Sequence, residues 1–150
     1  NTYISAVIFP DRLAALTNKQ QDWKTWSTRG YLDGFTPLFL TCDSKTANKM
    51  MTDVITAKSP NTDFYAGLFV TFMNGSDEDL IRQIHEARKL NAKGVIIFDY
   101  AHLNNKYINT LSTSVFSQHS PIKQPTQQIT AQPKIQPSAK RKGWWVFTKD

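Results

Sequence analysis

The chain has 150 residues, of which 40% are apolar and 12% aromatic, and this is enough for one globular domain with a proper core. Its net charge of +6 is unevenly distributed: residues 1–117 carry 12 basic and 11 acidic side chains, and residues 118–150 carry six basic and one acidic. A nearly neutral body lacks the clustered basic face of a nucleic-acid-binding domain, so we expect no nucleic-acid partner.

The first half of the chain alternates between strand and helix patterns. Tyr3–Phe9 is rich in β-branched and aromatic residues and predicts a strand. After a polar stretch, Gln20–Arg29 predicts a short helix, and Leu32–Thr41 predicts a second strand. The next helix begins at Asp43 or Ser44, either of which can cap it, and must end before Pro60.

The second half repeats this alternation twice. Phe64–Phe72 is almost wholly apolar and predicts the third strand. Ser76 and Asp79 have the spacing of a capping box and predict a helix start, with Gly94 ending the helix. Val95–Tyr100 then predicts the fourth strand, and Asn104–Ser117 predicts the last helix.

Apolar strands separated by amphipathic helices are typical of a parallel sheet covered by helices, so the fold class is α/β. We expect residues 3–9, 35–41, 65–71 and 95–99 to be parallel neighbours in that order. The four β–α units match the repeat length of a (β/α)8 barrel, but a small open sheet of flavodoxin-like type fits the same pattern equally well. Four strands alone leave two open edges and an uncovered face, so we expect the chain to pair with a missing half or to self-associate.

The composition changes after Ser117. We divide the chain into a body over 1–117, a Pro/Gln/Lys-rich linker over 118–143 and an aromatic segment over 144–150. Trp144 and Trp145 either fold back on the body or form a docking patch. The chain starts just ahead of a strand without a basic and apolar leader, and we interpret this as the loss of an upstream region.

Five segments together carry a resemblance to a known family. They are residues 4–11 (ISAVIFPD), 21–26 (QDWKTW), 30–37 (GYLDGFTP), 66–68 (AGL) and 94–100 (GVIIFDY). In this order and spacing they resemble the C-terminal half of the bacterial glycosyl-hydrolase-like family ten, over about residues 3–105.

The resemblance implies strands five to eight of a (β/α)8 barrel, with the N-terminal half-barrel upstream of Asn1. It also implies a secreted or cell-envelope glycoside hydrolase that acts on glycan strands, peptidoglycan among them. The sequence departs from the family pattern at Leu40, where a Tyr is usual, and at Asp99, where a small residue is more common. The family's acidic cluster at the end of the fourth strand would also lie before Asn1.

Glycoside hydrolysis needs two carboxyl groups, and in a barrel these lie where strands end. Asp11 follows the first strand and Asp99 follows the fourth, so both are catalytic candidates. Their structural alternatives are a turn cap or a pair with Arg12 for Asp11, and a salt bridge or helix cap for Asp99. Asp22 and Asp33 are interpreted as structural.

Aromatic and polar residues near the strand ends are candidates for sugar binding, because a pyranose ring stacks its apolar face on aromatic rings. Tyr100, Phe39 and His102 are the substrate-binding candidates. An ordinary polar contact remains the alternative for His102, and Trp23 and Trp26 more simply pack a helix onto the sheet.

Other chemistries find no support in the sequence. The three histidines lack metal-ligand spacing, so we expect no metal, and without a phosphate-binding loop we expect no cofactor. Cys42 is interpreted as a core residue. The sequence thus favours a glycan hydrolase, with a non-catalytic glycan-binding or structural barrel as the alternative.

Overall fold

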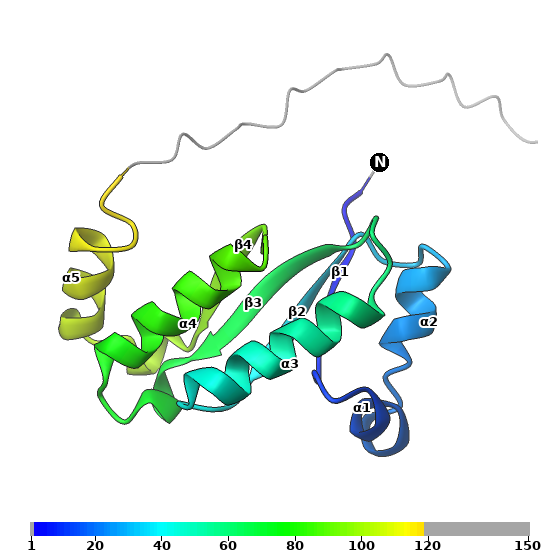
Figure 1. Ribbon diagram of the computed structural model, residues 1–150, viewed down its shortest axis with the longest axis horizontal. Helices are drawn as coiled ribbons and strands as arrows, with labels where there is room; N and C mark the ends of the chain where they lie inside the picture. Colours follow the sequence, from blue (N-terminus) through cyan, green and yellow to red (C-terminus); the bar gives the residue numbers. More distant parts are fainter. Residues whose placement is uncertain (1, 119–150) are drawn as a thin grey trace, which may run out of the picture. The chain divides into compact units, whose positions relative to one another are not determined.

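Strands and helices alternate along the chain as the sequence pattern predicts (Figure 1). The computed structural model describes residues 2–118, so the expected linker beyond residue 118 and the aromatic segment 144–150 lie outside the described residues. The strands are β1 (Ser5–Ile8), β2 (Gly34–Phe39), β3 (Asp63–Phe69) and β4 (Gly94–Phe98). The α-helices are α1 (Arg12–Lys19), α2 (Trp23–Thr28), α3 (Ser44–Ala57), α4 (Asp77–Lys89) and α5 (Asn105–Thr113), and two short 3-10 helices, η1 (Val70–Met73) and η2 (Tyr100–His102), follow β3 and β4.

The four strands form one parallel sheet in the order β1-β2-β3-β4. Val7 is level with Thr36 between β1 and β2, and Leu38, Gly67 and Ile96 are level across β2, β3 and β4. The α/β class and the predicted neighbour order are therefore confirmed. Both β1 and β4 end the sheet, so each has one edge unpaired within residues 2–118.

Side-chain caps begin the helices at the positions expected from the sequence. The Asp43 carboxylate accepts a hydrogen bond from the Thr46 N–H at 2.9 Å, and Ser76 Oγ accepts one from the Asp79 N–H at 3.2 Å. Asp22 caps α2 in the same way, which confirms its structural interpretation. These bonds satisfy N–H groups that the first helical turn cannot pair internally.

Two boundaries differ from the sequence prediction. The polar stretch after β1 forms the helix α1, which buries only Ala15 and therefore shows little apolar periodicity. The third strand ends at Phe69 rather than Phe72, because the chain turns into η1 there.

Cys42 is exposed, so its interpretation as a core residue was wrong.

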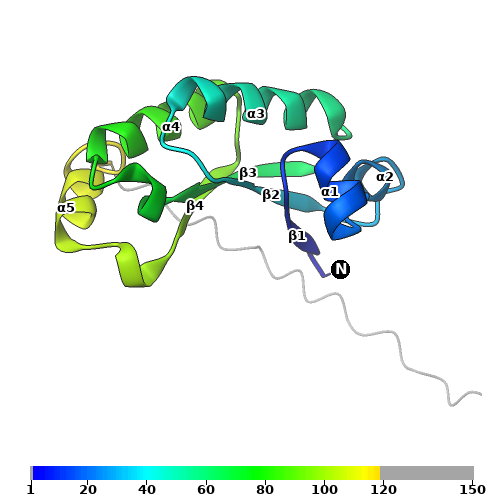
Figure 2. The same ribbon diagram turned by 90° about the horizontal axis from the view of Figure 1, so that it is seen from below.

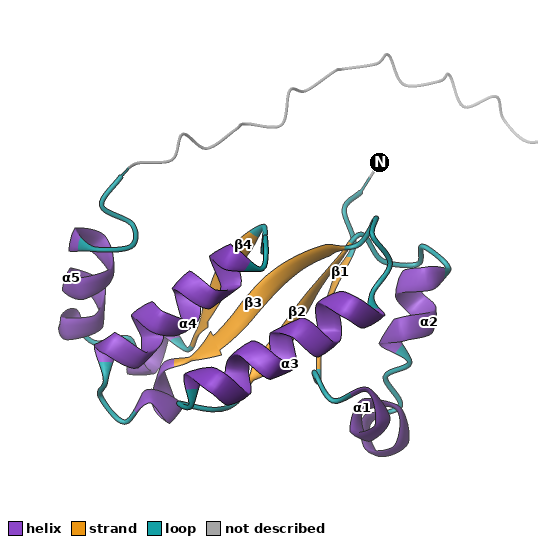
Figure 3. Ribbon diagram, viewed as in Figure 1, coloured by secondary structure: helices purple, strands orange, loops and turns teal. Residues whose placement is uncertain are grey.

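The hydrophobic core lies between the sheet and the helices. Helices α3 and α4 lie on the same face of the sheet (Figures 2 and 3). The strand side chains on that face are fully buried or nearly so: Ile8, Phe35, Phe39, Phe64, Ala66 and Leu68. Trp23 on α2 is also buried and packs edge-on against Phe35, with ring centroids 6.0 Å apart. Its assignment to packing is confirmed.

The opposite face of the sheet carries a second set of apolar side chains. Because side chains alternate along a strand, this set is Val7, Leu38, Tyr65, Phe69, Ile96 and Phe98, which we call the open face. No helix among residues 2–118 covers it (Figure 2). Val7 and Ile96 are 48% and 40% exposed, which is high for apolar side chains within strands. The alternation therefore leaves two apolar faces, of which only one is covered by described residues.

Candidate active site

The carboxyl ends of all four strands meet at one edge of the sheet, because the strands are parallel. Asp99 follows β4 directly, and Asp11 follows β1 after Phe9 and Pro10. Both sequence-predicted carboxylates therefore lie along this edge, which is where ligands bind in α/β proteins.

Asp99 and His102 form a dyad just beyond β4. Nδ1 of His102 lies 2.8 Å from Oδ1 of Asp99, and the His102 backbone N–H donates to the same oxygen at 3.1 Å. An ionised carboxylate can only accept, so Nδ1–H of His102 is the donor of this hydrogen bond. The two side chains are 52% and 56% exposed, so the dyad is open to a ligand from solvent.

The hydrogen bond from the His102 side chain lowers the pKa of Asp99 below its ordinary value, and backbone N–H donors act in the same direction. Asp99 is a carboxylate at neutral pH, and the hydrogen bond from His102 stabilises that form. A carboxylate suits the role of base or nucleophile rather than that of proton donor.

We expect this shift to be measurable. In an NMR titration the Asp99 carboxyl should titrate below the ordinary range, and His102→Ala should move its midpoint upward. A lowered carboxyl pKa means that the contribution of the dyad to stability is present above the ordinary pKa and is lost as the pH falls through the lowered value. An Asp99 midpoint that does not respond to His102→Ala would show that the imidazole does not hold the carboxylate.

Aromatic side chains lie beside the dyad. Tyr100 is 89% exposed, the most exposed of the large hydrophobic side chains in residues 2–118. Phe98 stacks on Phe69 of the neighbouring strand, with centroids 4.8 Å apart and planes 15° apart. Phe72 on η1 lies edge-on to Phe69 and is 44% exposed. The sequence did not predict Phe69, Phe72 or Phe98 as site residues, although each stands at or just past the end of a strand.

Asp11 and Asp99 both lie at the carboxyl ends of strands, but they follow the two outermost strands of the sheet, β1 and β4. Oδ1 of Asp11 accepts a hydrogen bond from the Ala14 N–H at 2.7 Å and caps α1, as the structural alternative anticipated. Since adjacent strands are about 4.8 Å apart, the ends of β1 and β4 are separated by three spacings, roughly 14 Å. Paired carboxyls of glycosidases are about 5–9.5 Å apart. One copy of the sheet thus does not bring Asp11 and Asp99 together.

Phe39 lies in the core rather than at the surface. It is fully buried on the helix side of β2 and packs edge-on against Phe64, with centroids 6.3 Å apart. Asp33 is structural as expected, because its Oδ2 accepts the Ile4 N–H at 2.7 Å and ties the start of β1 to β2. Neither side chain belongs to the surface around Asp99.

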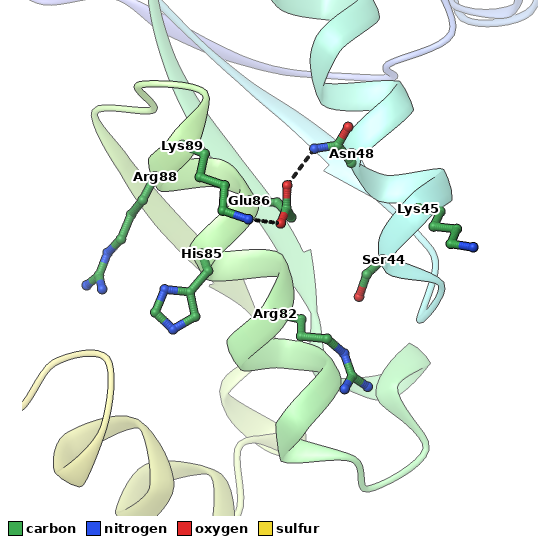
Figure 4. Close-up of a pocket in the computed structure, with 8 residues that line it drawn as sticks. All are labelled: Ser44, Lys45, Asn48, Arg82, His85, Glu86, Arg88 and Lys89. Carbon is green, nitrogen blue, oxygen red and sulfur yellow. Dashed lines mark hydrogen bonds and ion pairs between the residues drawn. The ribbon is translucent and has the colours of Figure 1, made fainter.

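A cavity of about 730 Å³ lies elsewhere, between α3 and α4 (Figure 4). It contains none of the predicted site residues. The Glu86 carboxylate accepts bonds from Asn48 and Lys89, both at 2.7 Å, and Arg82 pairs with Asp79. These internal pairs are typical of a polar helix–helix surface, so we place no chemistry there.

Residues 2–118 offer neither a metal cluster nor a membrane span. No group of three or more His, Cys, Asp or Glu side chains among them is arranged to hold a metal ion. None of the described helices has the length and apolar character that would let it cross a bilayer.

Comparison with known proteins gives no match among protein-family models, curated proteins or solved structures. Any functional assignment therefore depends on the geometry at the carboxyl edge of the sheet.

Proposed function

We propose that this chain is part of a secreted or cell-envelope glycoside hydrolase that cleaves glycan strands, peptidoglycan strands among them. The observation that supports this best is the Asp99 carboxylate, which is hydrogen-bonded to His102 at the carboxyl end of a parallel strand and lies beside the exposed Tyr100 ring. An exposed aromatic ring can stack on the apolar face of a pyranose, and a carboxylate beside it can take part in hydrolysis.

The proposed fold is a (β/α)8 barrel that four further parallel strands complete. The open face supports it, because an apolar inner face is what a closed barrel fills with interlocking side chains. The free edges of β1 and β4 support it as well, since exposed parallel edges seek pairing. In such a barrel the edge that carries Asp99 becomes the mouth where substrate binds.

In the proposed reaction Asp99 acts as the base. It takes a proton from a water molecule whose oxygen bonds to the anomeric carbon, while the glycosidic carbon–oxygen bond breaks. A second carboxyl group must donate a proton to the leaving oxygen, and solvent exchange then restores both groups. Asp11 is the sequence-predicted candidate for this role, and its cap bond to Ala14 uses Oδ1.

The second candidate function is non-catalytic glycan binding. The separation of Asp11 from Asp99 favours it, because the two carboxyl candidates follow the two outermost strands while Tyr100 beside Asp99 is exposed. A barrel that binds glycan without cleaving it would need the exposed Tyr100 and not the second carboxyl.

An assay of new reducing ends on isolated peptidoglycan strands separates the two candidates. We expect the reducing ends to increase with time and protein concentration, and not with heat-denatured protein. Co-sedimentation with the polymer without any new reducing ends would establish binding alone and contradict the hydrolase.

A further inference from the structure

We infer that Phe72 forms a second sugar-binding subsite at the carboxyl edge of the sheet, in addition to the one proposed for Tyr100. The inference rests on the proposed function, in either its hydrolytic or its binding form, and adds the size of the substrate: a chain of linked sugars that reaches both rings. Phe72 is then a residue that determines specificity for chain length.

The 3-10 helix η1 holds Phe72 in an exposed position directly beyond β3. Its first and last residues, Val70 and Met73, are buried in the core, whereas Phe72 between them is exposed. Because both ends of this short helix are anchored, the backbone of Phe72 is fixed relative to the sheet. An exposed aromatic ring on a fixed backbone loses little conformational freedom when a ligand stacks on it.

A continuous row of three aromatic rings connects Phe72 to the carboxylate. Phe72 contacts Phe69 edge-on, with ring centroids 6.1 Å apart and planes 80° apart, and Phe69 stacks on Phe98. Phe69 and Phe98 are level with each other at the end of β3 and β4, and Asp99 follows Phe98 directly. Both ring arrangements are ones that aromatic pairs favour. The Phe72 ring is thus packed into the surface that carries Asp99.

The exposure of Phe72 does not come from a missing neighbour of its strand. It follows β3, which pairs with β2 on one side and with β4 on the other, so any further strand pairs with β1 or β4 and not with β3. Phe72 also lies beyond Phe69 and Phe98, the last paired residues of these two strands. It therefore lies past the end of the ladder, at the edge where the proposed function places the substrate.

The chemistry of the two exposed rings suits two sugars of one chain. Each ring can stack on the apolar face of a pyranose. They come from different 3-10 helices, η1 and η2, and the ring contacts among residues 2–118 do not pair Tyr100 with Phe72. A sugar stacked on one ring leaves the other ring free, so only a chain of linked sugars uses both.

Calorimetry with oligosaccharides of two lengths tests the subsite. The full-length protein is titrated with a disaccharide and with a hexasaccharide, both cut from peptidoglycan strands, in an Asp99→Asn background so that neither is cut during the measurement. We expect tighter binding of the hexasaccharide. Adding Phe72→Ala should weaken hexasaccharide binding roughly two- to tenfold, the size of one lost stacking contact, and leave disaccharide binding at Tyr100 nearly unchanged.

Three further substitutions separate stacking on a sugar from packing on Phe69. Phe72→Leu keeps apolar contact with Phe69 but has no ring, so it should lose hexasaccharide affinity as Phe72→Ala does. Phe72→Tyr keeps the ring and should retain the affinity. Tyr31→Ala removes an exposed aromatic ring that precedes β2, at the amino end of the sheet, and as the matched control it should bind both oligosaccharides like the background protein.

Cleavage is assayed separately, on the chain with Asp99 intact, so that the two proposals fail in different ways. An undiminished preference for the hexasaccharide in Phe72→Ala overturns the subsite and leaves the proposed function standing where glycan is cleaved. An equal loss for both oligosaccharides also overturns it, because Phe72 then acts on the site as a whole. Loss of the preference in a chain that cleaves no glycan supports the subsite and contradicts the hydrolase. A protein that binds neither oligosaccharide contradicts both.

Discussion

Asp99→Asn should lower the turnover of glycan cleavage by roughly two to four orders of magnitude, the usual contribution of a general acid or base. Asparagine keeps the shape of the side chain and still accepts the His102 backbone N–H, so the cap of η2 is retained. The amide cannot take a proton from water. Folding should therefore be almost unchanged while the rate falls.

The measurement is kcat on glycan strands beside thermal unfolding, with the variant and the wild type at the same protein concentration. Asp53→Asn is the matched control, because Asp53 is also exposed and pairs with a cation on its own helix, Lys49. It should leave both quantities unchanged. Full turnover in Asp99→Asn would remove this carboxylate from the reaction and leave it only a structural cap.

Phe39→Ala should reduce the free energy of unfolding by about 3–5 kcal/mol, the usual cost of removing a buried phenylalanine ring. Phe39 is fully buried, and its loss opens a cavity against Phe64 between the sheet and the helices. Chemical denaturation at one protein concentration measures the effect. The substitution should act through folding and not through contact with a sugar.

Phe72→Ala provides the comparison, because Phe72 is 44% exposed and makes one edge-on contact with Phe69. We expect a loss of about 1 kcal/mol for it. If Phe39→Ala instead weakened glycan binding with no change in stability, Phe39 would be a substrate contact, as the sequence alone had suggested.

The strand order and the helix caps could be predicted from the sequence because their signals are local. Apolar runs mark the strands, and Asp43 and Ser76 stand where a side chain can reach the first free N–H groups. The helix α1 was not predicted from the sequence, because it buries a single residue. Its C-cap, Gln20, has a left-handed conformation without the glycine that usually marks such an end.

The direction of Phe39 could not be predicted for a related reason. Gly34–Phe39 is apolar at almost every position, so the two-residue period that separates the faces of a strand is hidden. The dyad of Asp99 and His102 was partly predictable from the sequence, since an Asp three residues before a His has the spacing of a cap. The separation of Asp11 from Asp99 depends on which strands end the sheet, and it became clear only with the strand order in the structure.

The most direct test of the central claim is an NMR map of the residues that a glycan contacts. A soluble oligosaccharide cut from peptidoglycan strands is added to labelled protein. We predict that the amide signals of Asp11, Tyr100 and His102, at the carboxyl edge of the sheet, shift together and saturate at one concentration. Shifts confined to Lys45, Asn48 and His85, in the cavity between α3 and α4, would contradict the assignment of the glycan site to that edge.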